Sequence, residues 1–405
     1  MKKVMIFALC MAAMGSASAQ KANVDAAKKL SGNLEKISEA RDLIGKAIQD
    51  PSTANDAMTY YIAGKIEMDA FNNAIRANSI QPESVSDDAM LDFLTNGYNY
   101  FLKALPLDQV PDEKGKVKPR VTKDIAKILN TEGQSINQMG AQMWEAQKYF
   151  PASYTYFVTY AGMADQPELN GLVAVPEQAA AQAYFNAGLA AYTGKGVREA
   201  ADAFSMARKH NYLDANGQPD PNAYVYEIAC WQNLAPTSPE YEAMAAQRIY
   251  EIANAGNQVF GLSQPVFINN LVNSLVMNEK YDEALAKVND LLAANPDNSN
   301  LYGLLGFVND RAGKDDASVD NYLKAVAIEN CDFETLKNAS KKLFRVGTAK
   351  LEQIDPTDKA GKEAIKANYY DKAKAITDRA KGMNPSDSDL NYVIENLDYA
   401  IETYF

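Results

Sequence analysis

A 34-residue period in the second half of the chain restricts the possible folds more than any other feature. Residues 265–298 and 299–332 fall into one pattern when the first stretch is shifted by 34 positions. The matching positions hold Ile268, Leu271, Val272, Leu275, Ala284, Val288, Leu291 and Pro296 in one copy, and Tyr302, Leu305, Gly306, Asn309, Ser318, Tyr322, Ala325 and Asn330 in the other. A repeat of this length is the signature of supersecondary units that bury their apolar faces by stacking on one another.

The pattern resembles the tetratricopeptide repeat, a helix-turn-helix unit with large apolar residues at places 4, 7 and 24. Small residues stand at places 8, 20 and 27, and proline near place 32. Small side chains are needed where two helices cross, because a larger one would push their axes apart. The resemblance implies an all-α fold, a right-handed α-α superhelix of about seven or eight repeats with a C-terminal capping helix.

Two further segments fit the same template. From residue 181, the matching residues are Tyr184, Ala187, Gly188, Ala200, Phe204, Ala207 and Tyr212. From residue 133, they are Ile136, Met139, Gly140, Met143, Ala152, Tyr156 and Thr159. We therefore expect irregular repeats over 20–105, a loop over 106–120, central repeats over 121–257, C-terminal repeats over 258–385 (265–298, 299–332 and 333–385 with an insertion) and a capping helix over 386–405.

The N-terminus reads as a secretory signal peptide. Lys2 and Lys3 precede an apolar run over 4–14, and Ala17 and Ala19 form a small-x-small cleavage site. The expected signal peptide therefore covers residues 1–19. Cys10 lies within the apolar run and follows Leu9, so no lipidation signal is indicated. A short start of this kind is typical of bacterial export, and we expect a periplasmic protein, with secretion as the alternative.

Composition disfavours several classes of function. Removing Lys2 and Lys3 leaves 38 basic and 52 acidic residues, a net charge near −14, which would repel nucleic acid. Cys230 and Cys331 are the only cysteines after residue 19 and are about 100 residues apart, so we expect small core residues rather than a disulfide. No later stretch has the length of an apolar membrane span, and the mature protein is expected to be soluble.

No pattern of catalytic or metal-binding residues is evident. His210 is the only histidine, and one histidine with no neighbouring ligand set indicates a cation near a helix C-terminus. The many carboxylates are those expected on the surface of an acidic helical protein, and no glycine-rich phosphate loop follows a strand pattern. The sequence therefore predicts a non-enzymatic protein without a metal or cofactor.

Tetratricopeptide arrays bind peptides along the face formed by their first helices, and places 2, 5, 9, 12 and 13 are exposed there. Carried over to this chain, the resemblance selects Trp144 and Glu145; Phe185, Leu189 and Tyr192; Tyr224 and Trp231; Asn269, Asn273, Val276 and Met277; and Phe307, Asp310 and Arg311. Aromatic residues are enriched in binding hot spots. The alternative is that these rings fill the inner wall of the array.

The next first helix adds Lys337, Lys341 and Arg345, which are spaced by four and form one basic stripe. With Arg311, the stripe would give a cationic end to the groove that could receive an acidic tail, although a solvated charged face is the alternative. Some family members bind acidic tails through a clamp of lysines and asparagines. In this chain only Asn273 corresponds to a residue of that clamp.

We expect a protein-protein interaction scaffold of the bacterial cell envelope that binds a peptide or protein partner in its groove, either free or associated with a membrane complex. The alternative is a glycan-binding or nutrient-capture protein built on similar helices.

Overall fold

The computed structural model describes residues 21–405, so the expected signal peptide over 1–19 lies outside the described residues. Within that range the chain is helical, and its only β interaction is a single bridge between Leu213 and Pro219. The expected all-α class with stacked helix-turn-helix pairs is confirmed. No helix in the described part of the chain is long and apolar enough to cross a membrane.

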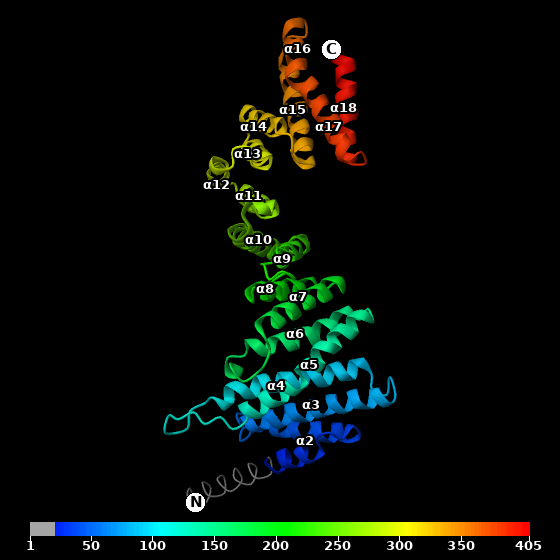
Figure 1. Cartoon of the computed structure of the whole chain (residues 1–405), viewed down its shortest axis with the longest axis vertical. Coiled ribbons are helices and arrows are strands. Elements are labelled where there is room, and N and C mark those ends of the chain that lie inside the picture. The colour runs from blue at the N-terminus through cyan, green and yellow to red at the C-terminus, as the bar shows by residue number, and fades with distance from the viewer. Residues whose placement is uncertain (1–20) are drawn as a thin grey trace, which may run out of the picture. The chain divides into compact units, whose positions relative to one another are not determined.

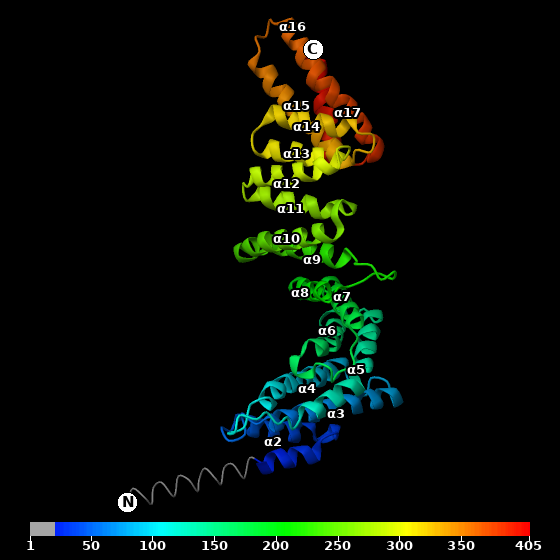
Figure 2. The same ribbon diagram turned by 60° about the vertical axis from the view of Figure 1, so that its left-hand side comes forward.

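The chain divides into two compact units, the first ending at Pro236 and the second beginning at Thr237 (Figures 1 and 2). This boundary falls inside the range 121–257 that we expected to hold the central repeats. Helix α9 packs against α8 in the first unit, whereas α10 packs against α11 in the second.

The first unit begins with a helical segment over 21–30, and each later helix packs mainly against its sequence neighbours. Its helices are η1 (Leu34–Lys36), α2 (Ile37–Gln49), α3 (Ala57–Ile80), α4 (Asp87–Asp108), α5 (Thr122–Glu145), η2 (Tyr149–Ser153), α6 (Tyr154–Gly162), η3 (Met163–Asp165), η4 (Pro167–Leu169), α7 (Glu177–Thr193), α8 (Val197–Lys209) and α9 (Asn222–Leu234).

The second unit contains both copies of the 34-residue pattern. Its helices are α10 (Pro239–Phe260), η6 (Gly261–Ser263), α11 (Pro265–Met277), α12 (Tyr281–Ala294), α13 (Ser299–Arg311), α14 (Asp315–Ala327), α15 (Phe333–Gln353), α16 (Lys359–Ile365), η7 (Lys366–Tyr370), α17 (Asp371–Met383) and α18 (Ser388–Tyr404). Helices α11 and α13 start 34 residues apart, as do α12 and α14, so the sequence period is also the structural period.

The turn between the two helices of a repeat has the same backbone geometry in four repeats. Place 15 has a positive φ each time, at Gln147 (59°), Lys195 (70°), Glu279 (57°) and Gly313 (72°). The next backbone N–H then closes onto a carbonyl near the end of the first helix, as in a Schellman turn. These bonds are Lys148 N to Met143 O (2.8 Å), Gly196 N to Ala191 O (2.8 Å), Lys280 N to Leu275 O (2.9 Å) and Lys314 N to Asn309 O (2.8 Å).

Glycine at place 8 lets an aromatic ring of the second helix lie against the backbone of the first. A β-carbon on Gly188 would lie 2.6 Å from Cδ1 of Phe204, and one on Gly306 would lie 2.8 Å from Cδ1 of Tyr322. In the repeat that starts at residue 265, two valines take the place of glycine and ring, and Val272 and Val288 are both fully buried. The combined volume at the helix crossing therefore matters more than the identity of either residue.

The repeat that starts at residue 133 departs from the expected register in its second helix. A β-carbon on Gly140 would meet Phe157 at 2.8 Å rather than Tyr156, and the Ser153 hydroxyl donates to the Gly140 carbonyl at 2.8 Å. In the repeat that starts at residue 299, Ser318 makes the same bond to Gly306 at 2.8 Å. Thirteen positions separate Gly140 from Ser153 and twelve separate Gly306 from Ser318. The kinked turn at η2, where Phe150 has an extended backbone (φ −134°, ψ 133°), therefore adds one residue. The assignment of Ala152 and Tyr156 to places 20 and 24 was therefore wrong by one position.

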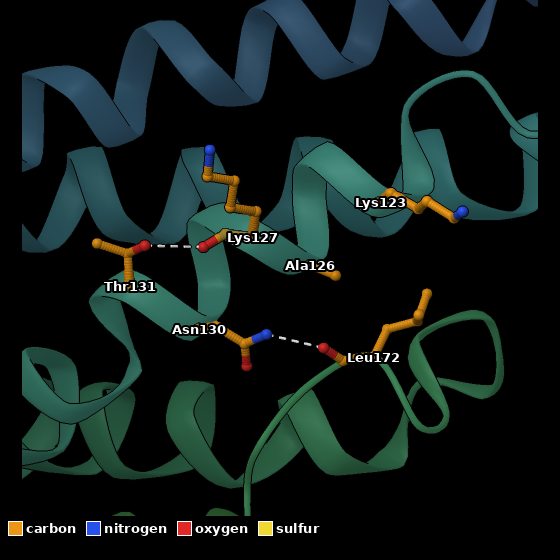
Figure 3. Close-up of a pocket in the computed structure, with 6 residues that line it drawn as sticks. All are labelled: Lys123, Ala126, Lys127, Asn130, Thr131 and Leu172. Atoms are coloured by element: carbon orange, nitrogen blue, oxygen red, sulfur yellow. Dashed lines mark hydrogen bonds between the residues drawn. The ribbon is translucent and has the colours of Figure 1, made fainter.

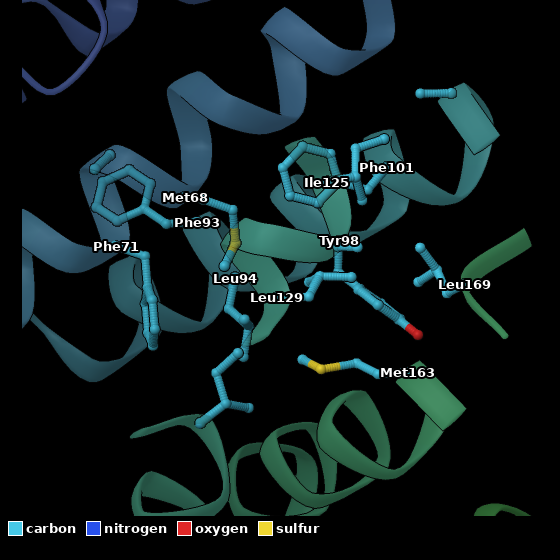
Figure 4. Close-up of a cluster of buried hydrophobic side chains, with 14 of the residues drawn as sticks. Met68, Phe71, Phe93, Leu94, Tyr98, Phe101, Ile125, Leu129, Met163 and Leu169 are labelled. Atoms are coloured by element: carbon cyan, nitrogen blue, oxygen red, sulfur yellow. The ribbon is translucent and has the colours of Figure 1, made fainter. Parts of the chain in front are cut away.

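An apolar cluster of the first unit lies between α3, α4, α5 and the segment that follows α6 (Figure 4). Met68 and Phe71 of α3 meet Leu94 and Tyr98 of α4 in this cluster. Ile125 and Leu129 join from α5, and Met163 and Leu169 from the following segment. The cluster joins the expected N-terminal repeats over 20–105 to the repeat that starts at residue 133.

The inserted residues of the repeat over 333–385 lie between α15 and α17 and contain α16 and η7. Arg379 of α17 donates to the backbone carbonyls of Val326 (2.7 Å), Ile328 (3.2 Å) and Glu329 at and just after the end of α14. Carbonyl groups at a helix end lack partners within the helix, so the guanidinium satisfies groups that would otherwise need solvent. The inserted repeat is thereby tied to the preceding one.

Cys230 of the first unit and Cys331 of the second are buried and unbridged. Burial raises the pKa of the Cys230 thiol to about 12 and that of Cys331 to about 11. The expectation that they are small core residues is confirmed.

We predict that Gly306→Val destabilises the protein by about 1–3 kcal/mol, because the new methyl groups collide with the Tyr322 ring. Adding Tyr322→Val recreates the valine pair of the preceding repeat and should recover part of this loss. Urea-induced unfolding measures both effects. Gly382→Val is the control, since a β-carbon there meets no atom within 4 Å. Wild-type stability of Gly306→Val would contradict the role given to the crossing.

Candidate partner-binding face

The first helices of the repeats carry the residues expected to bind a partner, and the structure separates them into exposed and buried groups. In the first unit these helices are α5, α7 and α9. Trp144, near the end of α5, is 37% exposed, and its ring meets the Tyr149 ring edge-on at 4.8 Å between centroids. Of the two tryptophans, Trp144 is the one that remains accessible to a partner.

Phe185 and Trp231 are core residues, which corrects the expectation that they face an open groove. Phe185 is 8% exposed and stacks on Tyr212 with centroids 4.3 Å apart and an interplanar angle of 9°. Tyr212 lies in the segment that follows α8, and its ring covers Phe185 of α7. Trp231 is 3% exposed, and the Arg198 guanidinium lies 5.0 Å from the centre of its ring. Both rings contribute to packing between helices, which was the alternative that the sequence left open.

Tyr192 and Tyr224 are half-buried and already engaged by neighbouring side chains. The Asn233 amide donates to the Tyr192 hydroxyl at 3.1 Å. The Arg208 guanidinium lies 5.2 Å from the centre of the Tyr224 ring, and its Nε donates to Glu227 at 2.9 Å. The repeat template did not select Arg208 or Asn233. It describes positions within one repeat and does not predict which side chains of the next helix contact them.

In the second unit, equivalent places of successive first helices form two rows, and α11 packs against α13 and α13 against α15. Place 9 is held by Asn273, Phe307 and Lys341, and place 13 by Met277, Arg311 and Arg345. Asn273 and Arg311 are exposed, and Met277 is 74% exposed. Phe307 is half-buried against the apolar cluster of the C-terminal helices. We call these six residues the two-row face.

Asn269 supports this face from its edge. Its Oδ1 accepts a hydrogen bond from the Asn300 amide at 3.0 Å, which links α11 to α13. Asn273, one turn further along α11, has no hydrogen-bond partner among the described residues, so its amide can still donate and accept.

The expected basic stripe is neutralised by carboxylates of α15 itself, of α13 and of the start of α18. Lys337 is 9% exposed and pairs with Glu334 (2.9 Å) and Asp387 (3.2 Å). Lys341 pairs with Asp389 at 2.9 Å, and Arg345 pairs with Asp310. The stripe therefore presents much less positive charge than the spacing on α15 alone indicates.

Lys342, which the sequence did not single out, takes the central position in this network. Its side chain is 1% exposed, and it pairs with Asp310 (2.6 Å) and Asp315. The hydrogen bond from Lys342 is the main reason that the pKa of Asp315 is lowered. A buried ammonium held by two carboxylates joins α13, α14 and α15, and losing one partner would leave a poorly compensated buried charge.

A shallow cleft of about 350 Å³ lies between α5 and the loop before α7 (Figure 3). Asn130 holds the loop through the Leu172 carbonyl (2.7 Å) and the Ala174 N–H (2.7 Å), while Ala126 and Leu172 line the cleft. Figure 3 shows the side chains of Lys123 and Lys127 pointing away from each other. The cleft does not bring two cations together around one anion.

The nearby N-terminus of α5 is also already occupied. The Asp108 carboxylate accepts the backbone N–H groups of Arg120, Val121 and Thr122, each at 2.9 Å, and the Thr122 hydroxyl at 2.8 Å. Burial acts to raise the pKa of Asp108, but these four donors outweigh it and the pKa is lowered. An external anion would have to displace an internal one here.

His210 caps the end of α8, where a cation was expected, and it is held by two carboxylates. Its Nε2 lies 2.9 Å from Asp165 Oδ1 and its Nδ1 lies 3.2 Å from Glu177 Oε1, while its ring stacks on Tyr184. This cluster ties the segment after α6 to the start of α7. Residues 21–405 contain no group of three or more histidine, cysteine or acidic side chains arranged to hold a metal ion.

Comparison with known proteins adds little beyond fold class. No family model matches the chain, and no curated protein sequence matches it. Among solved structures, the crystal structure of the P58(IPK) TPR domain matches with 12% identity, 95% of this chain and 98% of that chain covered, and a TM-score of 0.27. The Cut9–Hcn1 hetero-tetramer of APC/C matches with 12% identity, 94% and 84% coverage, and a TM-score of 0.29. These TM-scores are too low to show a relationship, and the all-α architecture of paired, repeated helices is defined by the structure of this chain itself.

We predict that Phe185→Ala lowers the free energy of unfolding by about 3–5 kcal/mol, the usual cost of removing a buried ring. Trp144→Ala should change it by less than about 1 kcal/mol, because that ring is at the surface. Chemical denaturation followed by circular dichroism compares the two variants. Equal, small losses would show that Phe185 is not a core residue.

Proposed function

We propose that this protein is a non-enzymatic scaffold that binds a peptide or an extended segment of a partner protein on the two-row face. The observation that carries the proposal is the exposure of Asn273, Met277 and Arg311 at equivalent places of adjacent first helices. No hydrogen bond or ion pair of their side chains to another described residue is present.

The chemistry of these three side chains suits an extended peptide. An asparagine amide donates and accepts, so Asn273 can pair with both the N–H and the C=O of a peptide backbone. Met277 offers an adaptable apolar contact for a partner side chain. Arg311 supplies a cation that can bind a carboxylate of the partner through two hydrogen bonds. Lys341 and Arg345 of the same face are ion-paired already and favour partners that are not strongly acidic.

A phage-displayed peptide library selected on the purified protein tests this function. We expect selected peptides that bind the wild type, and binding that falls at least about tenfold in the variant carrying Asn273→Ala, Met277→Ala and Arg311→Ala. The matched control carries Asn289→Ala and Lys287→Ala on α12 and should bind as the wild type does. Peptides that bind both variants equally well, or the selection of no peptide beside clear binding on a glycan array, would contradict the proposal.

We also propose that the scaffold works in the bacterial cell envelope, as a periplasmic or secreted protein, because residues 1–19 have the three parts of a signal peptide. When the full chain is expressed in a Gram-negative host, the protein recovered from the periplasm should begin at Gln20. Intact-mass measurement checks this expectation. Retention of residues 1–19 in a cytoplasmic protein would contradict it.

A further inference from the structure

The last helix, α18, has two different faces. Leu390, Val393, Ile394, Leu397 and Ala400 are buried against the preceding helices. The opposite side carries Tyr392, Glu395, Tyr399 and Glu402, all of them exposed. We call these four residues the tyrosine–glutamate stripe. The tyrosines are 67% and 64% exposed, an unusual position for two large rings on one helix.

The stripe is regular. Residues seven apart on an α-helix differ by about 20° in direction and by about 10 Å along the axis. Tyr392 and Tyr399 therefore form one lane, and Glu395 and Glu402 form a second lane beside it. A straight pair of lanes of this kind matches the geometry of another helix laid alongside.

The stripe differs from the rest of α18 in having no partner. Asp389 pairs with Lys341 at 2.9 Å and Asp398 pairs with Lys374 at 2.8 Å, so the acidic residues that flank the stripe are neutralised. Glu395 and Glu402 have no ion pair, and Tyr392 and Tyr399 have no side-chain hydrogen bond or ring contact, with any residue of 21–405. Neither lysine nor arginine occurs between 382 and 405. The stripe is thus negatively charged as well as aromatic.

A helix that merely closes a repeat array needs a polar outer face. Exposed tyrosines are not required for that purpose, whereas tyrosine is enriched in the hot spots of protein interfaces. An arginine or lysine head group is attracted both by the face of an aromatic ring and by a carboxylate. The stripe carries two aromatic rings and two carboxylates, and the two members of each kind are about 10 Å apart along the helix.

We propose that the tyrosine–glutamate stripe of α18 is a docking surface for a helical segment of a partner protein with arginine or lysine side chains seven residues apart. A second copy of α18 does not fit, because antiparallel pairing would bring the unpaired glutamates of both copies together. This surface lies at the end of the array and uses none of the residues of the two-row face, so it is a second binding region beyond the proposed function.

The test measures binding of a synthetic helical peptide to the full chain by fluorescence anisotropy. The probe carries arginine at two positions seven residues apart, and a second peptide carries glutamine there. We expect the arginine peptide to bind the wild type. Affinity should fall at least about tenfold for Tyr392→Ala with Tyr399→Ala, and for Glu395→Gln with Glu402→Gln. Tyr392→Phe with Tyr399→Phe keeps both rings and should retain binding.

The charge control is Asp282→Asn with Asp290→Asn, which removes the same charge from exposed positions of α12 in the same unit. This variant should bind as the wild type does. Equal weakening in the charge control would show general attraction to an acidic protein and overturn the proposal. Unchanged binding in the stripe variants, or equal binding of the glutamine peptide, would do so as well. Self-association that is lost in the tyrosine-to-alanine variant would identify a second copy as the occupant instead.

Discussion

The close crossing of two helices within a repeat is the contact on which the rest of this structure depends. Because Gly188 and Gly306 have no side chain, the rings of Phe204 and Tyr322 can lie directly on the backbone of the first helix. The ring fills the space that the glycine leaves, which preserves the dense packing of a protein interior. Val272 and Val288 solve the same problem with two side chains of middle size. The constraint is therefore a volume shared by two positions 16 residues apart, fixed by the turn between them.

That crossing also determines which positions remain available for function. Once places 4, 7 and 8 of the first helix face its partner, places 9 and 13 are left on the opposite side, where packing inside the repeat does not select their chemistry. Asparagine, methionine, phenylalanine, lysine and arginine all occur there. Such positions are the natural place for recognition, because they can change without disturbing the core.

The distribution of ion pairs distinguishes the surfaces of the second unit. This protein has 52 acidic and 40 basic residues, so carboxylates are available to neutralise most cations. Lys337, Lys341 and Arg345 are each paired in this way, whereas Glu395 and Glu402 on α18 are not. The unpaired charge on α18 is therefore negative, whereas the unpaired charge on the two-row face is the cation of Arg311.

The sequence by itself determined the all-α class, the 34-residue period and the helix pairs, because these follow from local spacing and from small residues that recur at fixed places. It also identified the cysteines as core residues and α18 as an amphipathic final helix. In the repeat that starts at residue 133, the sequence pattern placed the second helix one residue too early, because nothing in the composition of the turn indicates the extra residue of η2.

Only the tertiary structure decided what each candidate side chain contacts. Tyr212 covers Phe185, and carboxylates from other helices neutralise the stripe of α15. These contacts join residues 27 to 50 positions apart through the packing of different helices, and periodicity within one helix carries no information about them. The sequence therefore specified the scaffold, while the packing of each helix on its neighbours decided which charges and rings remain exposed for a partner.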